Sequence, residues 1–158
     1  DDIESYINWG ILLMYGGAIV IATSLTRTGA AEWLSNTIFE FIPQSTFLIL
    51  VVIILITKFL TEGVSNVAAV AIVLPIAFSM GDILNLNPII ITYIVALTGG
   101  LAFCLPMGAP PNAIAFSSGY LELKEVLKVG LILNLISIIL LYIIAVRVWP
   151  LFGLKLFL

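Results

Sequence analysis

The chain has 158 residues, of which 62% are hydrophobic and 9% are charged. Soluble domains carry about a quarter charged residues, so this composition excludes an ordinary soluble fold, a disordered chain and a basic nucleic-acid-binding protein. The single cysteine, Cys104, excludes an internal disulfide, and the absence of histidine removes the commonest general base and metal ligand. An integral membrane protein that is not an enzyme remains.

Long charge-free runs divide the chain into segments. They cover 5–26, 41–57, 63–81, 83–121 and 129–146. A membrane helix needs about 20 mostly apolar residues, so the runs give room for roughly five or six complete or partial passes. The alternating pattern typical of lipid-exposed strands is not seen over these lengths. The predicted fold class is therefore all-α and multi-pass.

The first two segments, 1–29 and 30–43, differ in character. In the first, Trp9 and Arg27 stand at the two ends of an apolar helix, where they would serve as interfacial anchors. The second combines charged and aromatic residues, which is typical of an amphipathic helix lying along the membrane surface. We therefore expect one spanning helix followed by one interfacial helix.

The third segment, 44–81, is interrupted in the middle of apolar sequence, at 61–66. Gly63 weakens a helix there, and Ser65 and Asn66 are good N-caps for a new one. Backbone that leaves a helix at membrane depth must be buried in protein or line a cavity. The interruption is therefore read as the tip of a re-entrant hairpin; two spanning helices joined by a turn in water are the alternative.

The fourth segment, 82–128, has a second interruption, at 105–112. It contains three prolines and one glycine, which break the helical ladder. One half-helix is predicted to end near Leu105 and another to begin near Pro110, with Asn112 capping its first turn. The last segment, 129–158, contains a final spanning helix.

Paired interruptions of this kind are the usual binding-site architecture of secondary transporters. The amides at a half-helix N-terminus attract an anionic substrate, and unwound carbonyls coordinate sodium. Lys58 and Glu62 stand four residues apart inside apolar sequence, close to the first interruption. We favour a mutually neutralising pair on one helix face over a functional role for these two charges.

At the two interruptions the sequence resembles the divalent anion/sodium symporter family, in its C-terminal repeat. The motifs are LTEGVSNVA at 60–68 with LPI at 74–76, and FCLPMGAPPNAI at 103–114. Earlier in the chain, WGILLMYGG at 9–17 and RTG at 27–29 also fit the family. The motif at 103–114 is the most specific, and the likeness runs in order over nearly the whole chain.

The resemblance implies the C-terminal half of an inverted-repeat elevator transporter. Each segment then has a counterpart: 1–29 a spanning scaffold helix, 30–43 the arm helix, 44–81 the re-entrant hairpin, 82–128 the broken transmembrane helix and 129–158 the last transmembrane helix. In this family the hairpin and the broken helix move together as the transport domain. The arm helix links them to the scaffold.

Residue by residue, the resemblance also implies two sets of binding residues. The sodium site would be formed by Thr61, Val64, Asn66 and Gly108, several of them through backbone carbonyls. The anion would be contacted by Ser65, Asn66, Val67, Ala109 and Pro110. Sodium would be the transported co-ion, and no organic cofactor is expected.

The sequence departs from the family pattern at three positions. Val67 and Ala109 stand where the family has threonine, and Gly100 stands where serine is common. These departures leave the identity of the anion and the sodium stoichiometry open. A literal Ser-Asn-Thr triplet at 35–37 is interpreted as a decoy, because it lies in the amphipathic segment between two glutamates.

We favour sodium-coupled symport of a divalent anion (a C4-dicarboxylate, citrate or sulfate) across the inner cell membrane. Two alternatives remain. The weak Lys/Arg bias permits a dual-topology half-transporter that pairs with itself. A non-transporting structural subunit of a membrane complex is the other alternative.

The expected partners are Na⁺, a small anionic substrate and the lipid bilayer, with no nucleic acid. The family's site is built from two inverted repeats, and this chain holds one. The N-terminal repeat is therefore expected in the same or another chain, and the full transporter is expected to be a homodimer. The acidic start of the chain, at Asp1, lacks the basic region of a secretory signal peptide and fits a C-terminal portion of a longer protein.

Overall fold

A computed structural model describes residues 9–43, 45–105 and 108–157, and this part of the chain is helical. The predicted all-α class is confirmed. The helices are α2 (Trp9–Arg27), α3 (Ala30–Phe41), α4 (Thr46–Gly63), α5 (Asn66–Ile83), α6 (Pro88–Gly99), α7 (Pro110–Ser117) and α8 (Leu123–Ile143), followed by a π-helical turn (Ile144–Val148) and a 3-10 turn (Trp149–Phe152).

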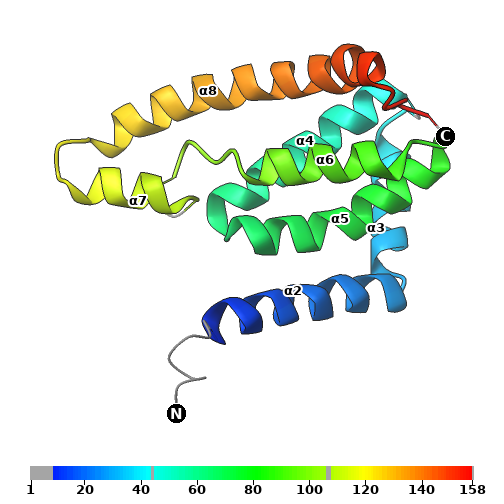
Figure 1. Ribbon diagram of the computed structural model, residues 1–158, viewed down its shortest axis with the longest axis horizontal. Helices are drawn as coiled ribbons and strands as arrows, with labels where there is room; N and C mark the ends of the chain where they lie inside the picture. The colour runs from blue at the N-terminus through cyan, green and yellow to red at the C-terminus, as the bar shows by residue number, and fades with distance from the viewer. Residues whose placement is uncertain (1–8, 44, 106–107, 158) are drawn as a thin grey trace.

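Helices α4, α5 and α6 lie side by side and form the centre of the fold (Figure 1). Helix α8 runs along one side of this group, and α2 lies on the other side, against α5. The core is made mainly of β-branched and other apolar side chains from the three central helices, which pack closely against one another. Its fully buried members include Ile49, Leu50, Ile53, Ile54, Val73, Met80, Ile90, Ile91, Ile94 and Val95.

The outer surface is apolar as well. On α8, Leu131, Leu135 and Ile139 are each more than half exposed. Within the described ranges, three helical stretches are long and apolar enough to cross a membrane, namely Thr46–Gly63, Asn66–Ile83 and Leu123–Phe152. Such side chains have a favourable environment in lipid and not in water, so the fold fits the multi-pass membrane protein that the composition predicts.

Two expected boundaries in the first half of the chain agree with the structure. Helix α2 ends at Arg27, and Gly29 follows with a φ of 73°, in the left-handed region that glycine adopts without strain. Helix α3 then occupies Ala30–Phe41 and packs against α5. The first two segments are therefore separate helices joined by a glycine turn.

Two boundaries in the second half differ from expectation. The prediction that the first half-helix ends near Leu105 is wrong, because α6 ends at Gly99 and the chain runs on outside a helix to Ala109. The last helix begins at Leu123, before the expected boundary at 129, because the charged residues preceding that boundary are good helix formers. Both interruptions lie at the same end of the central helices (Figure 1).

Candidate functional site

The first interruption is a two-residue break between α4 and α5. Helix α4 ends at Gly63, and Val64 and Ser65 both have extended backbone. Ser65 is the N-cap of α5, and its Oγ accepts a hydrogen bond from the amide of Ala68 at 3.3 Å. The predicted role of Ser65 as an N-cap is confirmed, and the amides of the first turn of α5 face outward from the tip.

Thr61 and Asn66 join this tip to the second interruption. Thr61 is fully buried, and its hydroxyl donates to the carbonyl of Gly99 at 2.6 Å. With its amide nitrogen turned inward, Asn66 donates to the carbonyls of Gly108 at 2.9 Å and Gly99 at 3.0 Å, and to Thr61 Oγ1 at 2.8 Å. Thr61 and Asn66 therefore contact the carbonyls of Gly99 and Gly108, which lie at the two ends of the non-helical gap between α6 and α7.

Glycine is favoured at these two carbonyl positions because neighbouring atoms leave little space for a side chain. A Cβ on Gly99 would lie 2.5 Å from Val70 Cγ2, and a Cβ on Gly108 would lie 2.9 Å from Ala102 Cβ. The latter would also lie 3.3 Å from the carbonyl oxygen of Thr61. Real Cβ atoms do not come this close to their neighbours, so side chains here would push the two interruptions apart.

The non-helical stretch after Gly99 is held by side chains from other elements. Glu62 accepts hydrogen bonds from the backbone amides of Phe103 at 2.9 Å, Cys104 at 3.0 Å and Leu105 at 2.8 Å. Lys58, which is 4% exposed, donates to the carbonyl of Leu101. Backbone polar groups that have left a helix in apolar surroundings are thereby satisfied.

The interpretation of Lys58 and Glu62 as a simple neutralising pair is therefore incomplete. Asn134 of α8 lies between them, accepting from Lys58 Nζ at 3.0 Å and donating to Glu62 Oε1 at 2.8 Å. Each charge also binds the backbone of the second interruption. Sequence spacing reveals the i,i+4 relation, but Asn134 has no signal in the sequence that ties it to residues so far away.

Asn112 also acts differently from the prediction. The N-cap of α7 is Ala109, and the first two helical positions are prolines. Prolines have no amide to cap, so the Asn112 side chain is free for another role. Its Nδ2 donates to the carbonyl of Ala102 at 2.9 Å and reaches that of Leu105 at 3.4 Å. Asn112 therefore stabilises the non-helical gap between α6 and α7 and does not cap α7 as predicted.

The residues implied for sodium are only partly gathered by the structure. Thr61, Asn66 and Gly108 come together, and Gly99, which the sequence did not single out, joins them. Val64 lies beside the tip with an exposed side chain, and its amide donates to Leu60. The consecutive glycines at 99–100 were the available sequence signal for the missed position.

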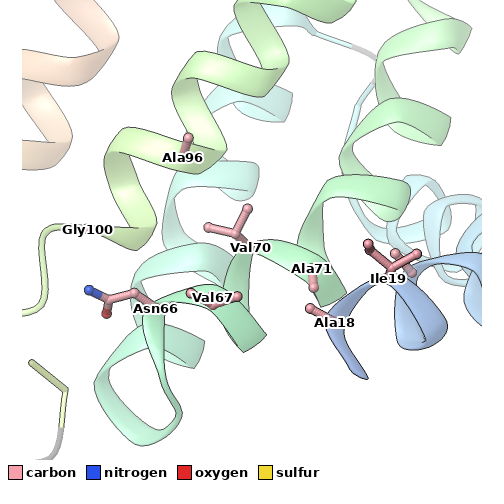
Figure 2. A pocket seen from close by; sticks show the side chains of 9 residues that line it. Ala18, Ile19, Asn66, Val67, Val70, Ala71, Ala96 and Gly100 are labelled. Atoms are coloured by element: carbon pink, nitrogen blue, oxygen red, sulfur yellow. The ribbon is translucent and has the colours of Figure 1, made fainter. Parts of the chain in front are cut away.

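The residues implied for the anion lie on two helix starts. Ser65 is exposed, and Asn66 and Val67 line a cavity of about 400 Å³ between α2, α5 and α6. In Figure 2 the labelled side chains of α5 lie between those of α6 and those of α2. Ala109 is half-buried just before α7, and the side chain of Pro110 lies outside the described part of the structure.

Both negative and positive ends of helix dipoles lie at this cluster. Helices α4 and α6 end at the cluster with their carbonyls, the negative ends of their dipoles. Helix α5 begins there with free amides, whereas α7, which begins shortly after Gly108, has prolines without amides at its first two positions. The carbonyl ends suit a cation, and the amide end of α5 suits an anion beside it.

Comparison with known proteins identifies relatives. The family model described as the sodium:sulfate symporter transmembrane region matches residues 1–155. A sodium-dependent dicarboxylate transporter, SdcS, of Staphylococcus saprophyticus is 31% identical over 149 residues, covering 94% of this chain and 29% of the relative. SdcS of Staphylococcus aureus strain USA300 is 33% identical over 149 residues, with the same two coverages of 94% and 29%.

An uncharacterized transporter of Haemophilus influenzae is 34% identical over 148 residues, covering 93% of this chain and 32% of the relative. The chain thus spans less than a third of the length of these curated relatives. The family match itself covers nearly every residue. The chain therefore belongs to the sodium:sulfate symporter transmembrane region family.

Proposed function

We propose that this chain supplies one sodium site and half of an anion site in a sodium-coupled symporter for a divalent anion. The candidate substrates are a C4-dicarboxylate, citrate or sulfate. Membership of a symporter family makes the chain part of a transporter and not an enzyme, and relatives named as sodium-dependent dicarboxylate transporters support sodium as the co-ion. The observation that carries the proposal is the meeting of Thr61 and Asn66 with the carbonyls of Gly99 and Gly108.

The donor set fits sodium. If the Asn66 side chain turns its oxygen inward, that oxygen joins Thr61 Oγ1 and the carbonyls of Gly99 and Gly108, all within 2.8–3.0 Å of it. Na⁺ in transporters is held by such oxygens from unwound backbone and half-helix C-termini. The dipoles of α4 and α6 add negative potential at the same place.

The same amide would couple the cation to the anion. An asparagine whose oxygen faces a cation turns its NH₂ group the other way, where it can donate to a carboxylate or sulfate oxygen. The hydroxyl of Ser65 and the free amides at the start of α5 are next to Asn66 at the tip. Sodium would therefore bind first and prepare the anion site without any lysine or arginine.

We further propose that α4 and α5 form a re-entrant hairpin that moves as one body with α6, α7 and α8. The hydrogen bonds of Thr61, Glu62 and Asn66 across the two interruptions support this grouping. Helix α3 would act as the arm that links this body to α2 in the scaffold. The first repeat, from the same chain or another, would complete the anion site, and the full transporter would be a homodimer in the inner cell membrane.

The test is uptake of radiolabelled succinate and sulfate by proteoliposomes containing the natural full-length protein. We expect uptake to require a sodium gradient and to be abolished by Asn66→Ala. The matched control is Asn36→Ala, which alters the asparagine of the Ser-Asn-Thr triplet at 35–37 on α3. Uptake that is indifferent to sodium, or unaffected by Asn66→Ala, would overturn the proposal.

A further inference from the structure

The carboxylate of Glu62 is unusually rich in hydrogen bonds for a residue that carries no expected role. It is half-buried in the last turn of α4. It accepts from three consecutive backbone amides, those of Phe103, Cys104 and Leu105, and from the side-chain amide of Asn134 at 2.8 Å. Its acceptor capacity is therefore filled by the protein itself, which leaves little of it for a substrate or a proton.

Three consecutive amides that point at one acceptor form a concave anion-binding arrangement, often called a nest. Here the anion is a side chain of the neighbouring hairpin and not a ligand. A neutral glutamine could offer only one oxygen, and its NH₂ group would face amide donors. The geometry of this stretch therefore depends on the negative charge of Glu62.

The nest lies between the two carbonyls of the cation cluster. Along the chain, Gly99 precedes Phe103 and Gly108 follows Leu105, so the stretch 103–105 stands between the two carbonyls in sequence. The downstream glycine also lies near the carboxylate, since a Cβ added to Gly108 would lie 3.2 Å from Glu62 Oε2. Upstream, Lys58 fixes the carbonyl of Leu101 and is itself held by Asn134.

We propose that Glu62 is a positioning residue for the sodium site. It fixes the stretch 103–105 as an internal anion, with Asn134 and Lys58 holding it in place. This inference rests on the proposed function. It assigns the sodium affinity of the transporter partly to a carboxylate that does not contact the ion.

The experiment measures anion uptake by the full-length protein in proteoliposomes against sodium concentration. For Glu62→Gln we expect half-maximal uptake to need roughly tenfold more sodium, the equivalent of one lost charge-assisted hydrogen bond. At saturating sodium the KM for the anion should return to within about twofold of wild type. A merely structural role would reduce the amount of active protein and leave the half-saturating sodium concentration unchanged.

Two further variants keep the test decisive. Glu125→Gln removes an exposed carboxylate on α8 and should leave the sodium dependence at the wild-type value. Asn134→Ala keeps the three backbone bonds of Glu62 and should give a smaller shift in the same direction, even if Glu62→Gln fails to fold. Wild-type uptake independent of sodium would overturn both proposals. Sodium-dependent uptake with unchanged half-saturation in Glu62→Gln and Asn134→Ala would overturn the positioning role alone.

Discussion

Asn134 accepts a hydrogen bond from Lys58 at 3.0 Å, and this contact ties α8 to the hairpin helix α4. The same asparagine donates to Glu62 at 2.8 Å, so one neutral side chain serves two opposite charges. In apolar surroundings a buried charge is costly unless it is paired or hydrogen-bonded. The contact therefore explains how two ionisable residues are tolerated in a helix that is otherwise apolar.

Thr61→Val should weaken sodium binding while leaving the shape of the side chain nearly intact. The substitution removes the hydroxyl that donates to Gly99 and leaves a buried carbonyl short of one donor, at a cost of about 1–3 kcal/mol. The measurement is the sodium concentration for half-maximal uptake, which should rise about tenfold. Thr57→Val is the matched control, because among the described residues the hydroxyl of buried Thr57 bonds to Ile53 of its own helix alone, at 2.7 Å; an equal shift in both variants would contradict this prediction.

Gly108→Ala should impair transport by separating the two interruptions. The added methyl group would lie 2.9 Å from Ala102 Cβ and 3.3 Å from the carbonyl oxygen of Thr61. Relief of this overlap moves the Gly108 carbonyl, and overpacking of this kind costs about 1–3 kcal/mol. Sodium-dependent uptake should fall, whereas Gly63→Ala should be tolerated because no described atom lies within 4 Å of a Cβ there.

Gly130→Ala should destabilise the packing of α8 against the gap. A Cβ at this position would lie 2.7 Å from the Cα of Cys104, which is backbone and cannot move aside like a side chain. We expect a loss of about 1–3 kcal/mol, seen as a lower midpoint of thermal unfolding in detergent. Gly17→Ala on α2 has open space around it and should leave the midpoint unchanged; a similar drop in both would point to a general effect of glycine replacement.

Val67→Thr should strengthen anion binding. Val67 lies in the first turn of α5 and lines the cavity beside Asn66. The divalent anion/sodium symporters that the sequence resembles have threonine at this position. A hydroxyl there adds a donor next to the helix N-terminus, and a net hydrogen bond is worth about 1 kcal/mol. The KM for the anion should fall roughly fivefold, measured by uptake at saturating sodium; a KM that rises would show that the anion does not approach this face.

The break between α4 and α5 could be predicted from the sequence because its signals are local. Gly63 and Ser65 mark the end of one helix and the cap of the next within three positions, and the structure has both. The turn at Gly29 could be predicted in the same way, since the left-handed conformation between two helices favours glycine.

The second interruption was only half predictable. The prolines near Pro110 fixed the start of α7, but nothing near Leu105 shows that α6 already ends at Gly99. The gap extends that far because its amides and carbonyls have partners on α4, α5 and α7. Contacts between residues so distant along the chain produce no periodic or compositional pattern in the sequence. The hydrogen bonds of Glu62 and Asn134 could not be predicted for the same reason.

The stretch between α6 and α7 has a consequence for how cation preference can change. Its backbone is held by side chains of neighbouring helices, so under the proposed function coordination distances would respond to substitutions one helix away. A genetic screen that selects growth on lithium in place of sodium would then recover changes at positions 58, 62 and 134 as well as at the coordinating atoms. Cation selectivity would then depend on the residues that hold the backbone of this stretch as well as on the residues that contact the ion.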